Sequence, residues 1–546
     1  MSLCGGAVAP RLHPEPAVVD YLAPQVVPAP VRLPATAPDV HAWPDSGTGT
    51  APTGKPDTRL AAVPLPWPPL PDSGSQPDLG ALLHTVYGLT RVQWLTGLDR
   101  LPLVGDLGAL AGEPGGGPVP RRPVPSAGAL YCVTLYCVLP EGCYRYDPLH
   151  HRLLPVRAGD HRAALGMSPT AASGWVCTVS LGTIPARYGE FGYRYGCVET
   201  GIVTAQCEVV APSAGLRAVR VAPFDPAVAA GLLRLDPLAE PVTEVVAFHP
   251  VAPTASPTPP PERPPATPRQ SPEPPPGPVD ALLPRTAALL RALHRGPATP
   301  IGGNAAQRAP LTTAPHPDPH HPTLELPCPH PLNLARGLSH RRAALRGFAQ
   351  LPINIADFAT VLAAAAPDEG QLFCYVNDVA GLPRGLFRYL PDRHRLLPIS
   401  LSSPGPALAA CAVQDFVREG FLNAAAGLVW AADPAHALRE HGADGVRLHY
   451  TRVGTAAQRA GLAAAARGLA SRVNADVLAD RLDELLGLHT ELPASTLLLQ
   501  LGHPAHGTTR PEHRLGPPEA QPANSPTTPT QRTEPHPIEP NPTPPN

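Results

Sequence analysis

Lysine is almost absent from this chain of 546 residues, and its single copy is Lys55. Lys55 lies in a proline-rich stretch, so no lysine can serve as a catalytic base in the parts of the chain expected to fold. The sequence also lacks a run of 18 apolar residues and therefore predicts no membrane span. Its first residues lack a charged segment followed by an apolar core, so we expect no secretory signal and a cytoplasmic protein.

Strong charge is also missing, since the net charge is −2 and the pI is about 6.9. Without a basic face, we expect no nucleic acid among the partners. The ten cysteines include no CxxC pair, which favours buried or free thiols in a reducing cytoplasm over disulfides. A group of metal-type side chains lies in proline-rich sequence without zinc-site spacing, so we expect no metal there: His316, His320, His321, Cys328 and His330.

Proline is abundant instead, with 80 copies concentrated in three stretches. Such stretches bury too little apolar surface to offset their ordering entropy, so we expect them to be disordered or polyproline-like. Two foldable blocks remain between them, each large enough for its own core. The predicted division is an N-terminal arm (1–76), a first domain (77–250), a linker (251–331), a second domain (332–504) and a tail (505–546).

The two blocks share a phrase. GCYRYDPLHHRLLPV (142–156) and GLFRYLPDRHRLLPI (385–399) are identical at nine of fifteen positions. Each is followed by a segment with two glycines fourteen residues apart, at positions 201 and 215 and at 454 and 468. The second of these segments predicts a helix that closes at its glycine, while Pro212 weakens the first.

Both blocks then end in the same way, with a short Leu-rich helix end, a turn, a β-rich strand and His-Pro (232–250 and 485–504). Three matched landmarks in one order indicate a duplicated domain. Alternating strands and helices make each copy α/β or α+β. A domain duplicated in tandem is usually a homodimer rewritten as one chain, so we expect an intramolecular pseudo-dimer.

The copies differ at two motifs. RRPVPSAGALY (121–131) occurs only in the first block, and SHRRAALRGF (339–348) only in the second. With the repeated phrase and RYGEFGYRYG (187–196), the first motif resembles the SagB/McbC-type dehydrogenases, flavoenzymes of the nitroreductase fold that oxidise azolines in ribosomal peptides. RRAALRGF resembles the Arg-x-Ser-x-Arg opening of the same superfamily, with Ala344 in place of the serine.

The resemblance implies two tandem nitroreductase-like α+β domains with FMN at their interface, one half supplying the flavin-edge loop and the other the phosphate clamp. Arg342 and Arg346 are four residues apart, on one face of a helix, and could clamp phosphate, although two such arginines could equally form a solvated face. In PSAG, the small residues would let backbone N–H groups approach the ring, or the segment could be a plain turn. The implied flavin-edge residues are Pro125, Ser126, Ala127 and Gly128, and Arg510 would add a phosphate contact.

The resemblance also suggests the catalytic pair. In the family a Lys-Tyr pair precedes the YRY segment, and here that place reads Arg187-Tyr188. Arginine stays protonated, so we expect Tyr188 to accept the proton and Arg187 to be its electrostatic partner. For Glu199, near the helix start, we expect a cap or ion pair rather than catalysis.

The predicted function is an FMN-dependent dehydrogenase that oxidises thiazoline or oxazoline rings in a precursor peptide, with one FMN per chain. A cyclodehydratase that makes the azolines and binds the leader would be its partner. Two alternatives stay open. One is a flavin reductase of small nitro or quinone compounds, and the other is a flavin-free docking subunit of the peptide-modifying complex, which the missing lysine, Ala344 and Pro212 favour.

Overall fold

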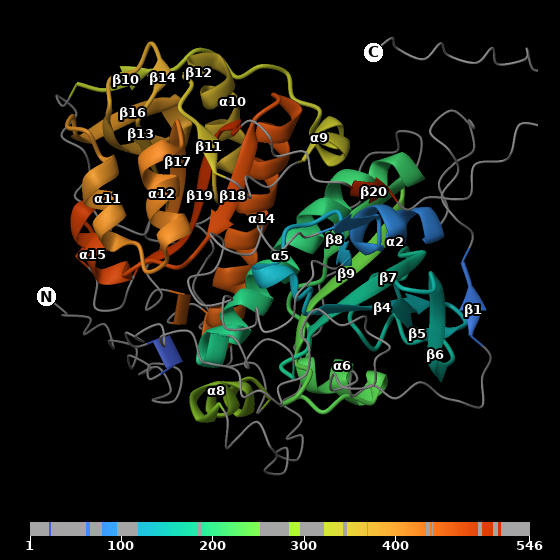
Figure 1. Cartoon of the computed structure of the whole chain (residues 1–546). Coiled ribbons are helices and arrows are strands. Elements are labelled where there is room, and N and C mark those ends of the chain that lie inside the picture. Colours follow the sequence, from blue (N-terminus) through green and yellow to red (C-terminus); the bar gives the residue numbers. More distant parts are fainter. Residues whose placement is uncertain are drawn as a thin grey trace, which may run out of the picture.

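The computed structural model contains two lobes of mixed helix and sheet that lie side by side (Figure 1). This bears out the α+β class expected from the sequence. No helix among the described residues is long and apolar enough to cross a membrane. The structure describes residues 21–22, 62–65, 79–94, 118–182, 188–251, 283–294, 322–341, 347–368, 370–432, 437–438, 441–489, 494–505 and 512–514.

A seven-stranded antiparallel sheet forms the centre of the first lobe. Its central strand β4 buries both faces, since Leu135 and Cys137 belong to one apolar cluster and Tyr136 and Val138 to another. A strand covered on both sides has a nearly continuous apolar sequence, as VTLYCVL shows. The strands lie in the order β1 (Val63–Pro64), β6 (Arg152–Ala158), β5 (Gly142–Asp147), β4 (Val133–Leu139), β7 (Ser173–Val179), β9 (Val242–Pro250) and β8 (Leu216–Arg220).

The sheet of the second lobe has the same strand order, so each strand of the first sheet has a positional counterpart. Within the described residues, the one addition is a two-residue strand, β11 (Phe348–Ala349), which pairs with the end of β19. The counterparts, in the same order, are β10 (Leu324–Glu325), β16 (Arg395–Ser400), β15 (Gly385–Leu390), β13 (Gln371–Val376), β17 (Ala426–Ala431), β19 (Ser495–Pro504) and β18 (Ala470–Asn474).

The repeated phrase is a β-hairpin in both lobes, β5–β6 and β15–β16. In the first, the Tyr146 hydroxyl and Nδ1 of His151 are hydrogen-bonded at 3.0 Å. In the second, Tyr389 and His394 make the same bond at 2.8 Å. Both histidines have a left-handed backbone, with φ of 48° and 49°. The Tyr and the His recur in both copies because their hydrogen bond stabilises the same strained turn.

Two long helices cross between the lobes, α5 (Gly192–Val210) and α14 (Asp444–Ala466) (Figure 1). A Cβ atom on Gly201 would lie 1.9 Å from the carbonyl oxygen of Thr451, and one on Gly454 would lie 2.0 Å from that of Val198. The glycines that the sequence repeat aligned therefore let the two backbones touch, each beside the partner helix.

The ends of these helices agree with the sequence. α14 is followed by Gly468 in a left-handed conformation with φ of 75°. In the first copy the α-helix ends at Val210, a short 3-10 turn with Pro212 follows, and Gly215 closes it with φ of 66°. Pro212 thus shortens the first helix as predicted, because it cannot donate the backbone hydrogen bond that an α-helix requires.

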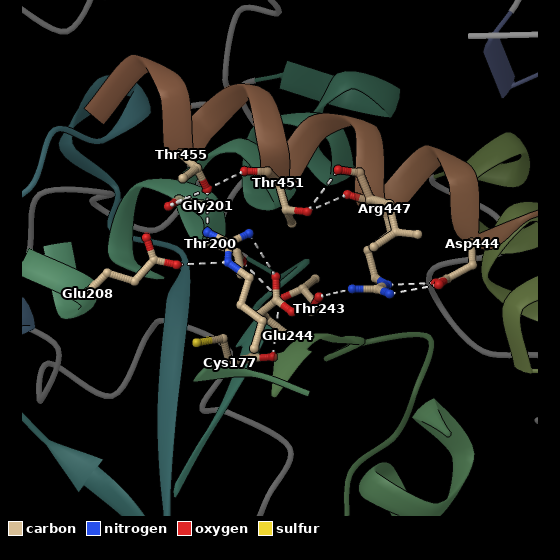
Figure 2. A network of polar contacts seen from close by, with 12 residues as sticks. Cys177, Thr200, Gly201, Glu208, Thr243, Glu244, Asp444, Arg447, Thr451 and Thr455 are labelled. Atoms are coloured by element: carbon tan, nitrogen blue, oxygen red, sulfur yellow. Dashed lines mark hydrogen bonds and ion pairs between the residues drawn. The ribbon is translucent and has the colours of Figure 1, made fainter. Parts of the chain in front are cut away.

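A network of polar side chains joins α14 to the first sheet (Figure 2). Arg447 donates to both carboxylate oxygens of Asp444 at 2.7 Å and to the carbonyl of Thr243 at 2.6 Å. Arg220, from β8, forms ion pairs with Glu208 and Glu244 at 3.1 and 3.5 Å and bonds to Thr455 of α14. Each of these charges has an opposite charge beside it, which offsets part of the cost of removing it from water.

The remaining helices cover the two sheets. α2 (Leu79–Tyr87) packs on α5, and α9 (Leu334–His340) and α10 (Ile355–Ala365) pack on α14. α6 (Pro226–Leu233) covers the outer face of the first sheet. α11 (Gly405–Cys411), α12 (Asp415–Asn423) and α15 (Ala479–Leu485) do so for the second. Two short strands, β12 (Ile353–Asn354) and β14 (Val379–Ala380), form a separate pair.

The proline-rich stretches contain ordered elements, which corrects the expectation that they are disordered throughout. The linker forms a helix, α8 (Pro284–His294), and the strand β10. The tail contributes β20 (Glu512–Arg514) to a small sheet with β2 (Arg91–Trp94) and β3 (Pro118–Arg121). In α8, proline stands at the first helical position, where its missing N–H costs nothing, and the leucines that follow find an apolar surface.

Candidate functional site

The PSAG segment forms a tight turn between β3 and β4. Residues Ala127–Ala129 make a single 3-10 turn. Gly128, Ala129 and Tyr131 all have a positive φ, of 58°, 59° and 50°. For a residue with a side chain, this conformation costs on the order of 1–3 kcal/mol, and such strain is concentrated at functional sites. The strained backbone makes this segment a candidate site.

The carboxylate of Glu199 accepts hydrogen bonds from this turn. Its Oε1 atom accepts the Ser126 hydroxyl at 2.9 Å and the Ala127 amide at 2.7 Å, and its Oε2 atom accepts the Cys132 thiol at 3.4 Å. Glu199 lies on α5 and is only 3% exposed. Burial raises its pKa to about 7, although the donors from Ala127 and Ser126 act in the opposite direction. Glu199 therefore binds the PSAG turn, a contact that differs from the helix cap or ion pair expected from the sequence.

The donors of the turn are largely used within the protein. Ser126 gives its hydroxyl proton to Glu199, and its oxygen accepts the Tyr131 amide at 2.7 Å. Ala127 gives its amide proton to Glu199. Among the described residues, none accepts the backbone amides of Ser126 and Gly128, so these two N–H groups are the PSAG donors left for a ligand. The Ser126 hydroxyl faces Glu199, and the place of Ser126 at a flavin edge stays a prediction.

Second-lobe residues reach this turn from two directions. Nε of Arg341 donates to the carbonyl of Pro123 at 2.8 Å, across 218 positions of sequence. From the tail, β20 pairs with β2, which pairs with β3 just before the turn. The predicted phosphate residues Arg342, Arg346 and Arg510 lie outside the described residues. Arg341 directly precedes the first, and β20 begins two residues after the last.

Tyr188 is half-buried at the start of the α5 region, and Arg187 lies outside the described residues. The ring of Tyr188 packs edge-on against Tyr195, with centroids 4.8 Å apart. Tyr195 in turn donates to Asp476 of the second lobe at 3.4 Å. Since Tyr195 and Glu199 are one helical turn apart, α5 connects the predicted proton acceptor with the PSAG turn.

Sequence reasoning missed the aromatic side of the turn. The guanidinium of Arg122 lies 4.2 Å from the centre of the Tyr87 ring and 5.2 Å from that of Tyr131. Arg122 also donates its amide to the Tyr131 hydroxyl at 3.1 Å. The signal was present in RRPVPSAGALY, where Arg122 and Tyr131 flank the turn, but the partner Tyr87 is too distant in sequence to be inferred.

The described residues contain no group of three or more His, Cys, Asp or Glu side chains arranged to hold a metal. Of the cluster considered in the sequence, Cys328 and His330 fall within the described part of the chain. His316, His320 and His321 lie outside it.

The fold is that of the nitroreductases. A solved nitroreductase-type structure from Anabaena variabilis matches with a TM-score of 0.62 at 20% identity, covering 83% of this chain and 96% of its own. A curated nitroreductase-type protein of Methanocaldococcus jannaschii is 32% identical over 142 residues, 26% of this chain and 68% of that protein. The chain belongs to the nitroreductase family, whose members are FMN-dependent oxidoreductases.

A weaker match is the Escherichia coli microcin synthetase McbBCD complex with truncated pro-MccB17 bound. It covers 24% of this chain and 55% of its own at 24% identity, with a TM-score of 0.22. No protein-family model matches the sequence.

Proposed function

We propose that this protein is an FMN-dependent dehydrogenase that oxidises azoline rings to azoles in a ribosomally made peptide. The contact between Arg341 and Pro123 carries the proposal, because it sets the segment that leads into the arginine clamp against the flavin-edge turn of the other lobe. Membership of the nitroreductase family supports the flavin chemistry. The resemblance of RRPVPSAGALY and RYGEFGYRYG to the SagB/McbC-type enzymes supports the azoline substrate.

The two lobes act as a fused pair of subunits in this proposal. Matching strand orders and the reciprocal glycine contacts of α5 and α14 support it. A single composite site would remain, with PSAG from the first lobe and Arg342 and Arg346 from the second. The reciprocal site has lost its parts, since α10 leads into β13 without a PSAG segment.

The residues around the turn fit a flavin. Gly128 offers an unused amide donor, and its neighbours Ala127 and Ala129 are small enough for a planar ring to approach. Arg342, Arg346 and Arg510 would hold the phosphate, since a guanidinium matches phosphate geometry with two parallel bonds. FMN, when bound, supplies the hydride acceptor. The turn would orient the ring, and Glu199 would keep the turn in place.

Aromatisation removes a proton from Cα of the azoline and a hydride from Cβ. In this proposal Tyr188 accepts the proton, and Arg187 stabilises the tyrosinate by its charge. Arg187 cannot be the base, since its guanidinium stays protonated. The substrate would be a precursor peptide that carries azolines, delivered by a cyclodehydratase that also binds the leader.

The decisive experiment combines flavin content with turnover. We expect about one FMN per purified chain, released on denaturation, and oxidation of an azoline peptide followed by its loss of two mass units per ring. Tyr188→Phe should abolish oxidation and keep the flavin. Tyr144→Phe is the matched control, because the second copy of the hairpin already carries Phe387 at that place. Two FMN per chain would contradict the single composite site.

A flavin-free docking subunit is the second candidate. The observation that favours it is the internal use of the Ser126 hydroxyl and the Ala127 amide, which leaves only the backbone amides of Ser126 and Gly128 for a ligand from that turn. A colourless protein that FMN cannot reconstitute would establish this candidate and remove the first.

A further inference from the structure

The segment that carries Tyr188 is held by two elements from the proline-rich stretches. Glu190, two residues after Tyr188, binds the N-terminus of the linker helix α8. Its carboxylate accepts the Arg285 amide at 2.9 Å, the Thr286 amide at 2.8 Å and the Thr286 hydroxyl at 2.5 Å. The first turn of a helix has unpaired amides and a partial positive charge, so a carboxylate there is strongly bound.

α8 is held by packing as well. Leu283, Ala287, Leu289 and Leu290 are each at most 3% exposed. Two of these leucines belong to the same apolar cluster as the buried residues of α5. The helix is therefore a fixed part of the first lobe, although it lies in the stretch of chain that links the two lobes.

The N-terminal arm contacts the same segment. The Tyr21 hydroxyl donates to the backbone carbonyl of Glu190 at 3.1 Å. Its own carbonyl accepts the guanidinium of Arg194, which lies 4.8 Å from the Tyr21 ring centre. Tyr21 is completely buried. The segment from Tyr188 to Arg194 is thus fixed on one side by α8 and on the other by the arm.

We propose that Glu190 is a positioning residue, which docks α8 and thereby fixes the turn that carries Tyr188. This inference rests on the proposed function for the role of Tyr188, but the contact itself does not. A glutamine at 190 would place an NH₂ group against N–H donors, because both carboxylate oxygens already accept from α8. The turn would then lose its bonds to α8, while its contact with Tyr21 and the rest of α5 stay in place.

The test uses the full-length, FMN-loaded protein and compares Glu190→Gln with Asp225→Asn. Asp225 is a matched control, since its carboxylate accepts two backbone amides at the start of α6 in the same lobe, at 2.9 and 3.2 Å. For Glu190→Gln we expect faster hydrogen exchange at residues 188–194 and 284–290, and a kcat lowered roughly tenfold with KM and flavin content unchanged. Asp225→Asn should change neither.

Two milder substitutions at Thr286 test the same contact in case Glu190→Gln does not fold. Thr286→Ala removes one donor and should produce a smaller change of the same kind, and Thr286→Ser should restore it. Unchanged exchange at 188–194 in Glu190→Gln would overturn the inference, and so would faster exchange with normal kcat. A wild-type protein without azoline oxidation would overturn the proposed function, and the exchange data would still decide whether α8 fixes the turn.

Discussion

The two lobes share a sheet and a crossing helix, yet they differ where the candidate site lies. In the first lobe 45 residues separate α2 from β4, and they include the PSAG turn. In the second, α10 leads almost directly into β13. Aligning Gly201 with Gly454 places Arg452 opposite Glu199, so the carboxylate that holds the turn also has no counterpart. The elements common to both lobes form the interface between them, and the elements that differ form the candidate site.

The same alignment pairs Arg194 with Arg447, and the two buried guanidinium groups contact different kinds of side chain. Arg447 is bound by the carboxylate of Asp444 and the carbonyl of Thr243. Arg194 lies near three aromatic rings, those of Tyr21, Phe191 and Tyr450, at 4.8 to 5.8 Å. Arg447 thus joins α14 to the first lobe through charge and a hydrogen bond. Arg194 joins α5 to Tyr21 of the N-terminal arm through an aromatic contact.

The largest effect on the free energy of unfolding should come from replacing Arg447, and replacing Arg194 should cost less. Arg447→Met should lower the free energy of unfolding by about 3–5 kcal/mol, because it leaves Asp444 and the buried network without their partner. Arg194→Met should cost only about 1–2 kcal/mol, since a long apolar side chain can still pack among the rings. Urea unfolding of both variants measures the difference, and equal costs would refute this distinction.

Glu199 should make its own contribution to the pH dependence of stability. Its pKa is about 7 in the folded protein against 4.5 for an ordinary glutamate, so this group binds more protons in the folded state between these values. The stabilisation that Glu199 contributes should therefore fall as the pH rises from about 4.5 to 7, by about 3 kcal/mol at most, while the buried His84 and His449, whose pKa values burial lowers to about 4, act in the opposite direction. Glu199→Gln should remove this part of the slope, which thermal unfolding at a series of pH values would show. Arg452→Gln is the control from the second lobe, and we expect it to keep the slope.

The crossing of α5 and α14 can be tested by the same substitution in each helix. Gly201→Ala and Gly454→Ala should each cost about 1–3 kcal/mol, because the added methyl group would meet a backbone carbonyl of the other helix. Gly231→Ala is the matched control in α6, where nothing lies within 4 Å of the new Cβ. It should stabilise the helix by about 0.5–1 kcal/mol. A harmless Gly201→Ala beside a costly Gly454→Ala, measured by thermal unfolding, would show that the crossing is not symmetric.

The smallest effects should come from the hairpins. Tyr146→Phe should cost about 1–2 kcal/mol, since its partner His151 is buried. Tyr389→Phe should cost about 0.5–1 kcal/mol, because His394 is only half-buried and water can replace the lost bond. Larger destabilisation from Tyr389→Phe in urea unfolding would reverse this order.

Much of the fold followed from local sequence. The repeated phrase indicated the duplication, and Gly468 marked the end of the second long helix. That the phrase forms a hairpin, and that α5 and α14 cross at Gly201 and Gly454, appeared only in the structure. The prediction was less successful for the proline-rich stretches. Composition alone suggested disorder, and it could not show that α8 would find an apolar surface and a carboxylate to cap it.

The sequence by itself determined the class of fold, the duplication and the motif that bends before β4. These depend on residues close together in the chain, through turn conformation and apolar periodicity. Only the tertiary structure decided where the donors of that motif point. Ser126 and Glu199 are 73 positions apart, and Arg341 and Pro123 are 218 apart. Such contacts depend on how helices and lobes pack, because packing determines which buried polar groups lie close enough to form hydrogen bonds.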